Sequence, residues 1–141
     1  MRLISVETAH EMHDAVHDAL PNMDVSIFAA AVADFRPESP NQEKLKRSDR
    51  KEGFSVSFKD NPDIAGDTAS RRKPGSVAVG FALETNDLIE NAEKKLISKS
   101  FDLVVANDAT DEDSGFDVAT NRVTILSRGR EPEQLSLMPK P

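Results

Sequence analysis

Three apolar stretches of the sequence end in side chains that can bind a ligand. The stretch FAAAVADFRP places a lone carboxylate, Asp34, after a run of small and apolar residues. Phe81 and Glu84 follow SVAVG, and Asn107 and Asp108 follow FDLVVA. Because ligands of open α/β sheets bind beyond the carboxyl ends of the strands, these positions predict a binding site. The alternative is that Asp34 and Asn107 only cap turns, as strand-end Asp and Asn often do.

Basic side chains are concentrated in one segment of an otherwise acidic chain. That segment contains Lys44, Lys46, Arg47, Arg50 and Lys51, whereas the whole chain has a net charge of −7. A cation brought in by a closing loop can neutralise the charge that develops on a phosphoryl group. A basic run of this kind is also typical of a solvated loop that binds nothing.

Two further features can bind an anion. Lys95 and Lys99 are four residues apart, so a helix would place them on one face, where they either hold a polyphosphate or only improve solubility. The stretch NPDI predicts a helix start with Asn61 as N-cap candidate and Pro62 at the first helical position. The unpaired N–H groups of such a start are a general anion site.

Three histidines, His10, His13 and His17, share one side of the first predicted helix. Three imidazoles can bind zinc, but no carboxylate on this helix is placed to support such a site. They lie opposite the apolar residues of the helix, and we therefore expect them to be ordinary surface side chains.

The composition excludes several classes of protein. The 141 residues, 38% hydrophobic and 30% charged, are typical of one compact globular domain. The absence of cysteine excludes disulfides and thiolate chemistry and is consistent with a reducing cytoplasm. No signal peptide is seen, and no apolar run approaches the ~20 residues of a membrane span. The negative net charge disfavours nucleic acid and anionic membranes as partners.

The hydrophobic pattern alternates between strands and helices. We expect strands at 2–6, 24–32, 54–58, 76–83 and 101–107, helices at 8–20, 61–72 and 85–100, and edge strands within 115–127 and 134–138. The nearly continuous apolar run at 24–32 predicts a strand that is buried on both faces. Thr8 and Glu11 have capping-box spacing at the first helix. The proline-rich, charged residues 36–52 are expected to form a mobile lid. The predicted fold is α/β, with three layers and a mostly parallel sheet.

Six motifs in order resemble the phosphopantothenoylcysteine synthetase family, the ligase half of the bacterial bifunctional coenzyme A biosynthesis protein. They are AAVADFRP, EKLKR, NPDI, VGFALET, KKLISKSFDLVVAND and GFDVATNRVTIL. The resemblance covers nearly the whole chain, and Leu83 replaces an alanine of the family pattern. It implies a Rossmann-like three-layer sandwich that is truncated at the amino end. The family's glycine-rich strand–turn–helix, with its catalytic asparagine, and its last helix have no counterpart in these 141 residues.

The resemblance implies a two-step reaction in coenzyme A biosynthesis. The carboxylate of 4′-phosphopantothenate attacks the α-phosphate of CTP, and the amine of L-cysteine then displaces CMP from the acyl-cytidylate. Mg²⁺ is expected with the triphosphate, held mostly by phosphate oxygens and water. FMN is expected only in the decarboxylase half, a fused or separate partner, and the ligase is expected to be a cytoplasmic homodimer.

The resemblance also assigns site residues. Lys44 is implied as the catalytic cation, and Lys95 and Lys99 as ligands of the triphosphate. The other implied nucleotide contacts are Ala30, Ala31, Asp34, Asn61, Pro62, Asp63, Ile64 and Phe81. Two hypotheses follow: a CTP-dependent ligase, or the major part of one, and a non-catalytic module for nucleotide binding or dimerisation.

Overall fold

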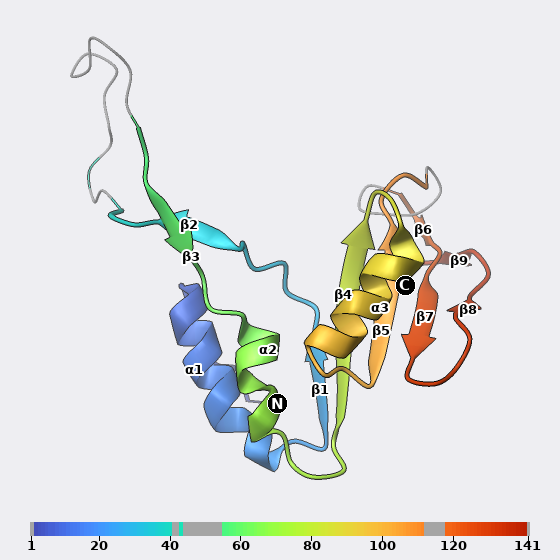
Figure 1. Cartoon of the computed structure of the whole chain (residues 1–141), viewed down its shortest axis with the longest axis horizontal. Coiled ribbons are helices and arrows are strands. Elements are labelled where there is room, and N and C mark those ends of the chain that lie inside the picture. Colours follow the sequence, from blue (N-terminus) through green and yellow to red (C-terminus); the bar gives the residue numbers. More distant parts are fainter. Residues whose placement is uncertain (1, 41–42, 44–54, 112–117, 141) are drawn as a thin grey trace.

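The computed structural model describes residues 2–40, 43, 55–111 and 118–140. The helices are α1 (Ala9–Ala19), α2 (Ile64–Thr68) and α3 (Leu88–Ser98), with short 3₁₀ helices at Leu20–Asn22 and Ala69–Arg71. The strands are β1 (Val25–Phe28), β2 (Phe35–Pro37), β3 (Phe58–Asp60), β4 (Val77–Glu84), β5 (Leu103–Asp108), β6 (Thr120–Asn121), β7 (Thr124–Ser127), β8 (Glu133–Gln134) and β9 (Met138–Pro139). Figure 1 shows how these elements are arranged.

The main sheet has five strands in the order β1-β4-β5-β7-β8. β1 pairs with β4 and β4 with β5 in parallel, whereas β7 and β8 add antiparallel strands at one edge. The predicted α/β fold with a mostly parallel central sheet and turn-linked edge strands is confirmed. Because β1, β4 and β5 run in the same direction, the carboxyl ends of these three strands point toward the same end of the sheet.

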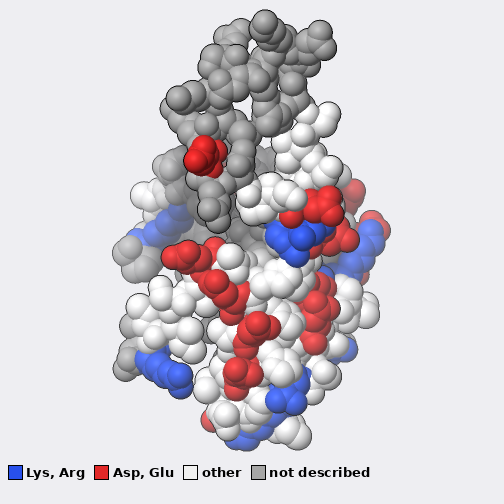
Figure 2. All heavy atoms as spheres, turned by 90° about the vertical axis from the view of Figure 1, so that its left-hand side faces the viewer, with Lys and Arg blue, Asp and Glu red and all other residues white. Residues whose placement is uncertain are grey.

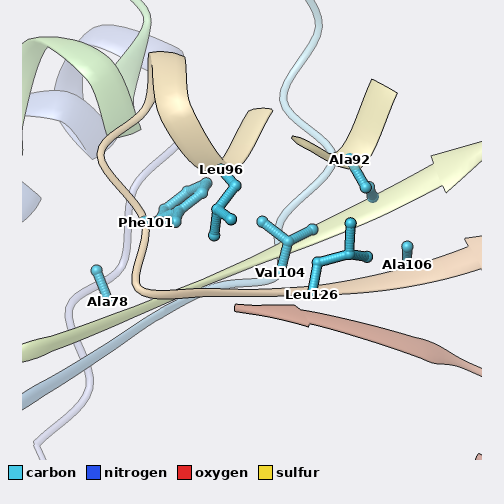
Figure 3. Packing of buried hydrophobic residues seen from close by; sticks show 8 residues of the cluster. Ala78, Ala92, Leu96, Phe101, Val104, Ala106 and Leu126 are labelled. Carbon is cyan, nitrogen blue, oxygen red and sulfur yellow. The ribbon is translucent and has the colours of Figure 1, made fainter. Parts of the chain in front are cut away.

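The core lies between α3 and one face of the sheet (Figure 3). Ala92 and Leu96 of α3 are buried against Val104 of β5 and Leu126 of β7, with the Phe101 ring at one end of the cluster. Leu88, Ala92 and Leu96, spaced four residues apart, form the apolar face that fixes α3, and hence its lysines, against the sheet. The helix begins three residues later than predicted, at Leu88, because residues 85–87 form a turn.

The expectation that the run at 24–32 is buried on both faces is wrong for β1, and β4 is also exposed on one face. Val25 and Ile27 are 55% and 65% exposed, and in β4 the exposed Phe81 and Leu83 alternate with the buried Ala82. Among the described helices, α3 packs on one face of the sheet, so side chains on the opposite face remain accessible. β1 is also shorter than the predicted strand and ends at Phe28.

The amino-terminal residues 2–6 were expected to form a strand, and this prediction is wrong. The segment has no regular structure, and Leu3 is 84% exposed. A strand needs a neighbour to complete its hydrogen bonds, and no described strand pairs with this segment. The next prediction holds, because α1 begins with the expected capping box between Thr8 and Glu11.

The helix predicted at 61–72 is shorter and begins later. α2 spans Ile64–Thr68 and continues as a 3₁₀ helix to Arg71. Its N-cap is Asp63, whose Oδ1 accepts a hydrogen bond from the Gly66 N–H at 3.1 Å. Asn61 is therefore not the N-cap and Pro62 is not the first helical residue. The carboxylate of Asp63 is a better acceptor at this position than the Asn61 side chain, which is used elsewhere.

A two-stranded arm replaces part of the predicted loop. β2 and β3 pair antiparallel, with Phe35 opposite Asp60 and Pro37 opposite Phe58, and the arm extends away from the sheet (Figure 1). Of the predicted strand 54–58, only Phe58 lies in β3. Proline is tolerated here because a short edge ribbon does not need every N–H. The remainder of the predicted lid, with Lys44 and the basic cluster, lies outside the described residues.

Within the part of the chain that the structure describes, every helix is too short or too polar to cross a bilayer.

Candidate functional site

One cavity of about 690 Å³ gathers most of the residues that the sequence analysis singled out. It lies between α1, β1 with the segment that follows it, the start of α2, and the lysine-bearing side of α3. The predicted residues on its wall are Ala30, Asp34, Asn61, Pro62, Asp63, Ile64, Phe81, Lys95 and Lys99. Ala31 is not part of the wall, and Lys44 lies outside the described residues. Four motifs distant in sequence therefore meet at one place.

The Asp34 carboxylate is available to a ligand. Asp34 is exposed at the cavity, and its side chain makes no hydrogen bond or ion pair with another described residue. Its backbone carbonyl, by contrast, accepts a hydrogen bond from the Asn61 N–H at 2.7 Å. A capping aspartate would use its side chain for that purpose. The contacts therefore favour the ligand-binding interpretation of Asp34 over the turn-capping one.

Lys95 and Lys99 both point toward the cavity from α3. Their side chains are 34% and 31% exposed, less than expected for lysines that serve only solubility. Lys95 Nζ lies 3.4 Å from the Phe81 carbonyl oxygen and 3.9 Å from Glu84 Oε1. Lys99 Nζ pairs with Asp63 Oδ2. Two ammonium groups on one wall can exchange these carboxylates for phosphate oxygens.

Asp63 therefore has two functions in the unliganded protein. Oδ1 caps α2, and Oδ2 pairs with Lys99. At the predicted anion site, the Asp63 carboxylate accepts the hydrogen bond of the Gly66 N–H at the start of this five-residue helix. Lys95 and Lys99 supply positive charge on the cavity wall.

The cavity also has an apolar part that the sequence analysis did not assign. Met12, Val16 and Leu20 from the α1 side face Val25 and Ile27 of β1 across it. Their helical and strand spacing was visible in the sequence but was interpreted only as core packing. The apolar part can accept the uncharged portion of a ligand. The polar part near Asp34, Lys95 and Lys99 can accept a charged portion.

The surface on the side of α1 carries more Asp and Glu than Lys and Arg (Figure 2). An anionic ligand is therefore not attracted by this face in general. It needs the local charges of Lys95 and Lys99. The described residues contain no group of three or more His, Asp or Glu side chains that could hold a metal ion, so a metal here would depend on oxygens of a bound ligand.

Among the described residues, the three histidines of α1 are not part of any group that could hold a metal ion. His13 and His17 stack at a centroid distance of 6.3 Å, and each contacts the neighbouring aspartate, Asp14 or Asp18. His10 Nε2 instead lies 3.3 Å from a guanidinium nitrogen of Arg36, a contact that the sequence did not predict.

The end of β5 has a structural function. Asp108 Oδ1 accepts hydrogen bonds from the N–H and hydroxyl of Thr110, and these bonds lower the pKa of the Asp108 carboxyl. Asn107 Nδ2 donates to Asn121 Oδ1 at 2.6 Å and so links β5 to β6. Turn capping, the alternative considered for Asp34 and Asn107, is thus found at the neighbouring Asp108, whereas the Asn107 side chain bonds to Asn121 and Arg122. A smaller second cavity of about 310 Å³ lies beside this end of β5, lined by Leu88, Ala106, Asp108, Asp111, Arg122, Thr124 and Gln134.

Comparison with known proteins shows that the sequence of this chain is similar to a described family and to several curated proteins. The family model described as DFP, the DNA/pantothenate metabolism flavoprotein C-terminal domain, matches residues 1–141. A cysteine/cysteine sulfinic acid decarboxylase from an unknown prokaryotic organism is 36% identical over 140 residues, which are 99% of this chain and 38% of that protein. The coenzyme A biosynthesis bifunctional protein CoaBC of Vibrio vulnificus (strain YJ016) is 38% identical over 122 residues, 86% of this chain and 30% of that protein.

A solved structure shows the same arrangement of elements. The crystal structure of the C-terminal domain of a coenzyme A biosynthesis bifunctional protein CoaBC superposes with a TM-score of 0.68 at 31% identity. The match covers 94% of this chain and 55% of that one. This chain thus spans well under half of each curated relative and little more than half of the solved domain.

Proposed function

Because this chain belongs to the family of the DNA/pantothenate metabolism flavoprotein C-terminal domain, we propose that it acts as a phosphopantothenate–cysteine ligase in coenzyme A biosynthesis. The membership agrees with the six motifs that resemble the phosphopantothenoylcysteine synthetase family. The observation that carries the proposal is the cavity, which brings Asp34, Phe81, Lys95 and Lys99 together from separate motifs. An acid, an aromatic ring and two ammonium groups are suited to a nucleoside triphosphate.

The proposed reaction has two steps, and CTP is the nucleotide. A carboxylate oxygen of 4′-phosphopantothenate attacks the α-phosphorus of CTP, a new P–O bond forms, and pyrophosphate leaves with the electron pair of the broken bond. The amine of L-cysteine then attacks the activated carbonyl, loses a proton and expels CMP, which leaves an amide. Both steps develop negative charge on phosphate oxygens, and fixed cations stabilise that charge.

The proposed contacts follow from the position of each residue. Lys95 and Lys99 leave Glu84 and Asp63 and bind the triphosphate. The exposed ring of Phe81 packs against the nucleotide. The short side chain of Ala30 allows the nucleotide to approach the backbone, and the neighbouring Ala31, which is outside the cavity wall, has no contact assigned by its position.

Asp34 contacts the nucleotide or the Mg²⁺ that accompanies it. The described residues offer this carboxylate at the cavity but no full set of protein ligands, which fits an ion held mainly by phosphate oxygens and water. When bound, Mg²⁺ would neutralise part of the negative charge of the phosphates. Asn61, Pro62, Asp63 and Ile64 form the opposite wall of the site.

The proposed assembly is a homodimer that works with a decarboxylase half, fused or separate, to which FMN belongs. The exposed rings of Phe35 and Phe58 on the arm, 60% and 61% accessible, support a surface that contacts a second copy.

Pyrophosphate release tests the proposal. With CTP, Mg²⁺ and 4′-phosphopantothenate, the protein releases pyrophosphate only when all three are present, and added cysteine then yields CMP and the amide product. Saturable CTP binding without any pyrophosphate release, in this chain and in a chain extended to the length of the solved domain, would instead establish a non-catalytic nucleotide-binding module.

Lys44→Gln separates chemistry from binding in the same assay. We propose that Lys44 stabilises the α-phosphate charge mainly in the transition state, so its loss lowers turnover ~100- to 1,000-fold while CTP affinity persists. Lys51→Gln, from the same basic segment, is the matched control. Equal small effects of both substitutions would show that the segment is only a charged linker.

A further inference from the structure

A network of hydrogen bonds lies at the base of the arm, next to the cavity. Its centre is Arg36 of β2. One guanidinium nitrogen, Nη1, donates to the Asp60 carbonyl and to Asn61 Oδ1, the latter at 3.0 Å. The other, Nη2, lies 3.3 Å from His10 Nε2 on α1. Arg36 therefore connects the arm, α1 and the segment that leads into α2.

Asn61 links the two walls of the cavity. Its Nδ2 donates to the Ala33 carbonyl at 2.8 Å, and its backbone N–H donates to the Asp34 carbonyl at 2.7 Å. The first wall is the segment after β1 that carries the Asp34 carboxylate, and the second is the stretch before α2. Both ends of the Asn61 side-chain amide are occupied by protein groups. One N–H of Nδ2 and one lone pair of Oδ1 are therefore taken by protein groups.

The orientation of the Asn61 amide depends on Arg36. A side-chain amide has one acceptor end and one donor end, whereas a guanidinium group only donates. Arg36 therefore favours the orientation in which Asn61 Oδ1 faces the guanidinium and Nδ2 faces the Ala33 carbonyl. The acceptor Nε2 of His10 holds the second guanidinium nitrogen and restrains its rotation.

We propose that Arg36 is a positioning residue for the candidate nucleotide site, acting through Asn61. Arg36 fixes the side-chain amide of Asn61, and Asn61 in turn holds the backbone of Ala33 and Asp34 next to the segment that leads into α2. This sets the position of the Asp34 carboxylate. The inference rests on the proposed function for its effect on nucleotide binding. The network itself is independent of that function. Asn61 joins the walls and does not use its side chain to bind the ligand.

Arg36→Met removes the donors but keeps much of the side-chain volume. We expect CTP to bind about 10-fold more weakly, as for the loss of hydrogen bonds that involve a charged group. Arg36→Lys retains the charge and one donor nitrogen and should recover part of the affinity. Arg71→Met, on an exposed arginine in the 3₁₀ helix, is the matched control and should bind CTP like the unmodified protein.

The pairing of Arg36 with Asn61 is tested by combining substitutions. If Arg36 acts through Asn61, the Arg36→Met/Asn61→Ala double variant binds CTP no more weakly than Asn61→Ala alone. Losses that multiply would show that the two residues act independently, and this would overturn the proposal.

A measurement without nucleotide separates this inference from the proposed function. Hydrogen exchange of the Asn61 backbone N–H reports its bond to the Asp34 carbonyl. Arg36→Met should accelerate this exchange about 10-fold, whereas Arg71→Met should not. Unchanged exchange in Arg36→Met overturns the positioning role whatever CTP does. Accelerated exchange in a protein that fails to bind CTP would support the positioning role and contradict the proposed function.

Discussion

At the scale of single residues, Asp34 and Asp108 behave differently, although in the sequence each comes at the end of a predicted strand. The Asp108 carboxylate accepts hydrogen bonds from the Thr110 N–H and hydroxyl, whereas the Asp34 carboxylate has no partner among the described residues. Asp34 is exposed and Asp108 is half-buried, and their hydrogen bonds differ in the same sense. The position of a carboxylate at a strand end thus indicates a ligand only when the local turn does not already use it.

Asp34→Asn should reduce nucleotide affinity far more than stability. The substitution removes a charge that faces the cavity but no hydrogen bond of the fold, so CTP affinity should fall about 10- to 100-fold. Calorimetric titration with CTP and thermal unfolding, measured on one sample, give the two quantities. Asp108→Asn is the control and should do the reverse, with lower thermal stability and unchanged affinity. A lowered melting temperature with unchanged affinity in Asp34→Asn would restore the capping interpretation.

The lysines of α3 should distinguish a triphosphate from a monophosphate. Lys95→Gln and Lys99→Gln each remove an ammonium group from the cavity wall and should weaken CTP about 10-fold, with much smaller effects on CMP. Lys94→Gln is the control, because Lys94 pairs with Glu90 on the exposed side of the same helix. If the variants lost equal affinity for CTP and CMP, the lysines would not bind the β- and γ-phosphates of CTP.

At the scale of elements, the sequence predicted the parallel strands β4 and β5 and helix α3 well, because their apolar periodicity is matched by real burial. It failed where tertiary pairing decides the outcome. Residues 2–6 have a strand-like composition but no described partner strand, and β2 forms through pairing with β3 despite Pro37. The sequence predicted which residues form the site. It did not predict the hydrogen bonds between Arg36 and Asn61, because no sequence pattern indicates that one side-chain amide bonds to two separate loops.

Gly80 of β4 tests how closely the core elements pack. A Cβ on Gly80 would lie 2.3 Å from Cε2 of the Phe101 ring, which also packs on Phe28 and lines the cavity. Gly80→Ala should therefore lower the free energy of unfolding by about 1–3 kcal/mol, the usual cost of overpacking. Urea denaturation measures this, with Ser98→Ala, at an exposed position of α3, as a neutral control. Unchanged stability would mean that the Phe101 ring moves aside without cost.

At the scale of the whole molecule, the cavity lies along β1 and the segment that follows it and reaches Phe81 of β4. Its walls come from α1, the start of α2, α3 and the sheet, so a ligand bound there contacts all of these elements. The negative net charge restricts the anionic part of a ligand to the two lysines of α3. The account therefore depends on a single claim, that this cavity binds the nucleotide.

A titration with CTP and Mg²⁺, followed by the backbone amide resonances of the whole chain, tests that claim most directly. We predict saturable binding with shifts that cluster at Ala30, Asp34, Asn61, Phe81 and Lys95. Binding that shifts resonances around the second cavity instead, or no saturable binding at millimolar CTP, would contradict it.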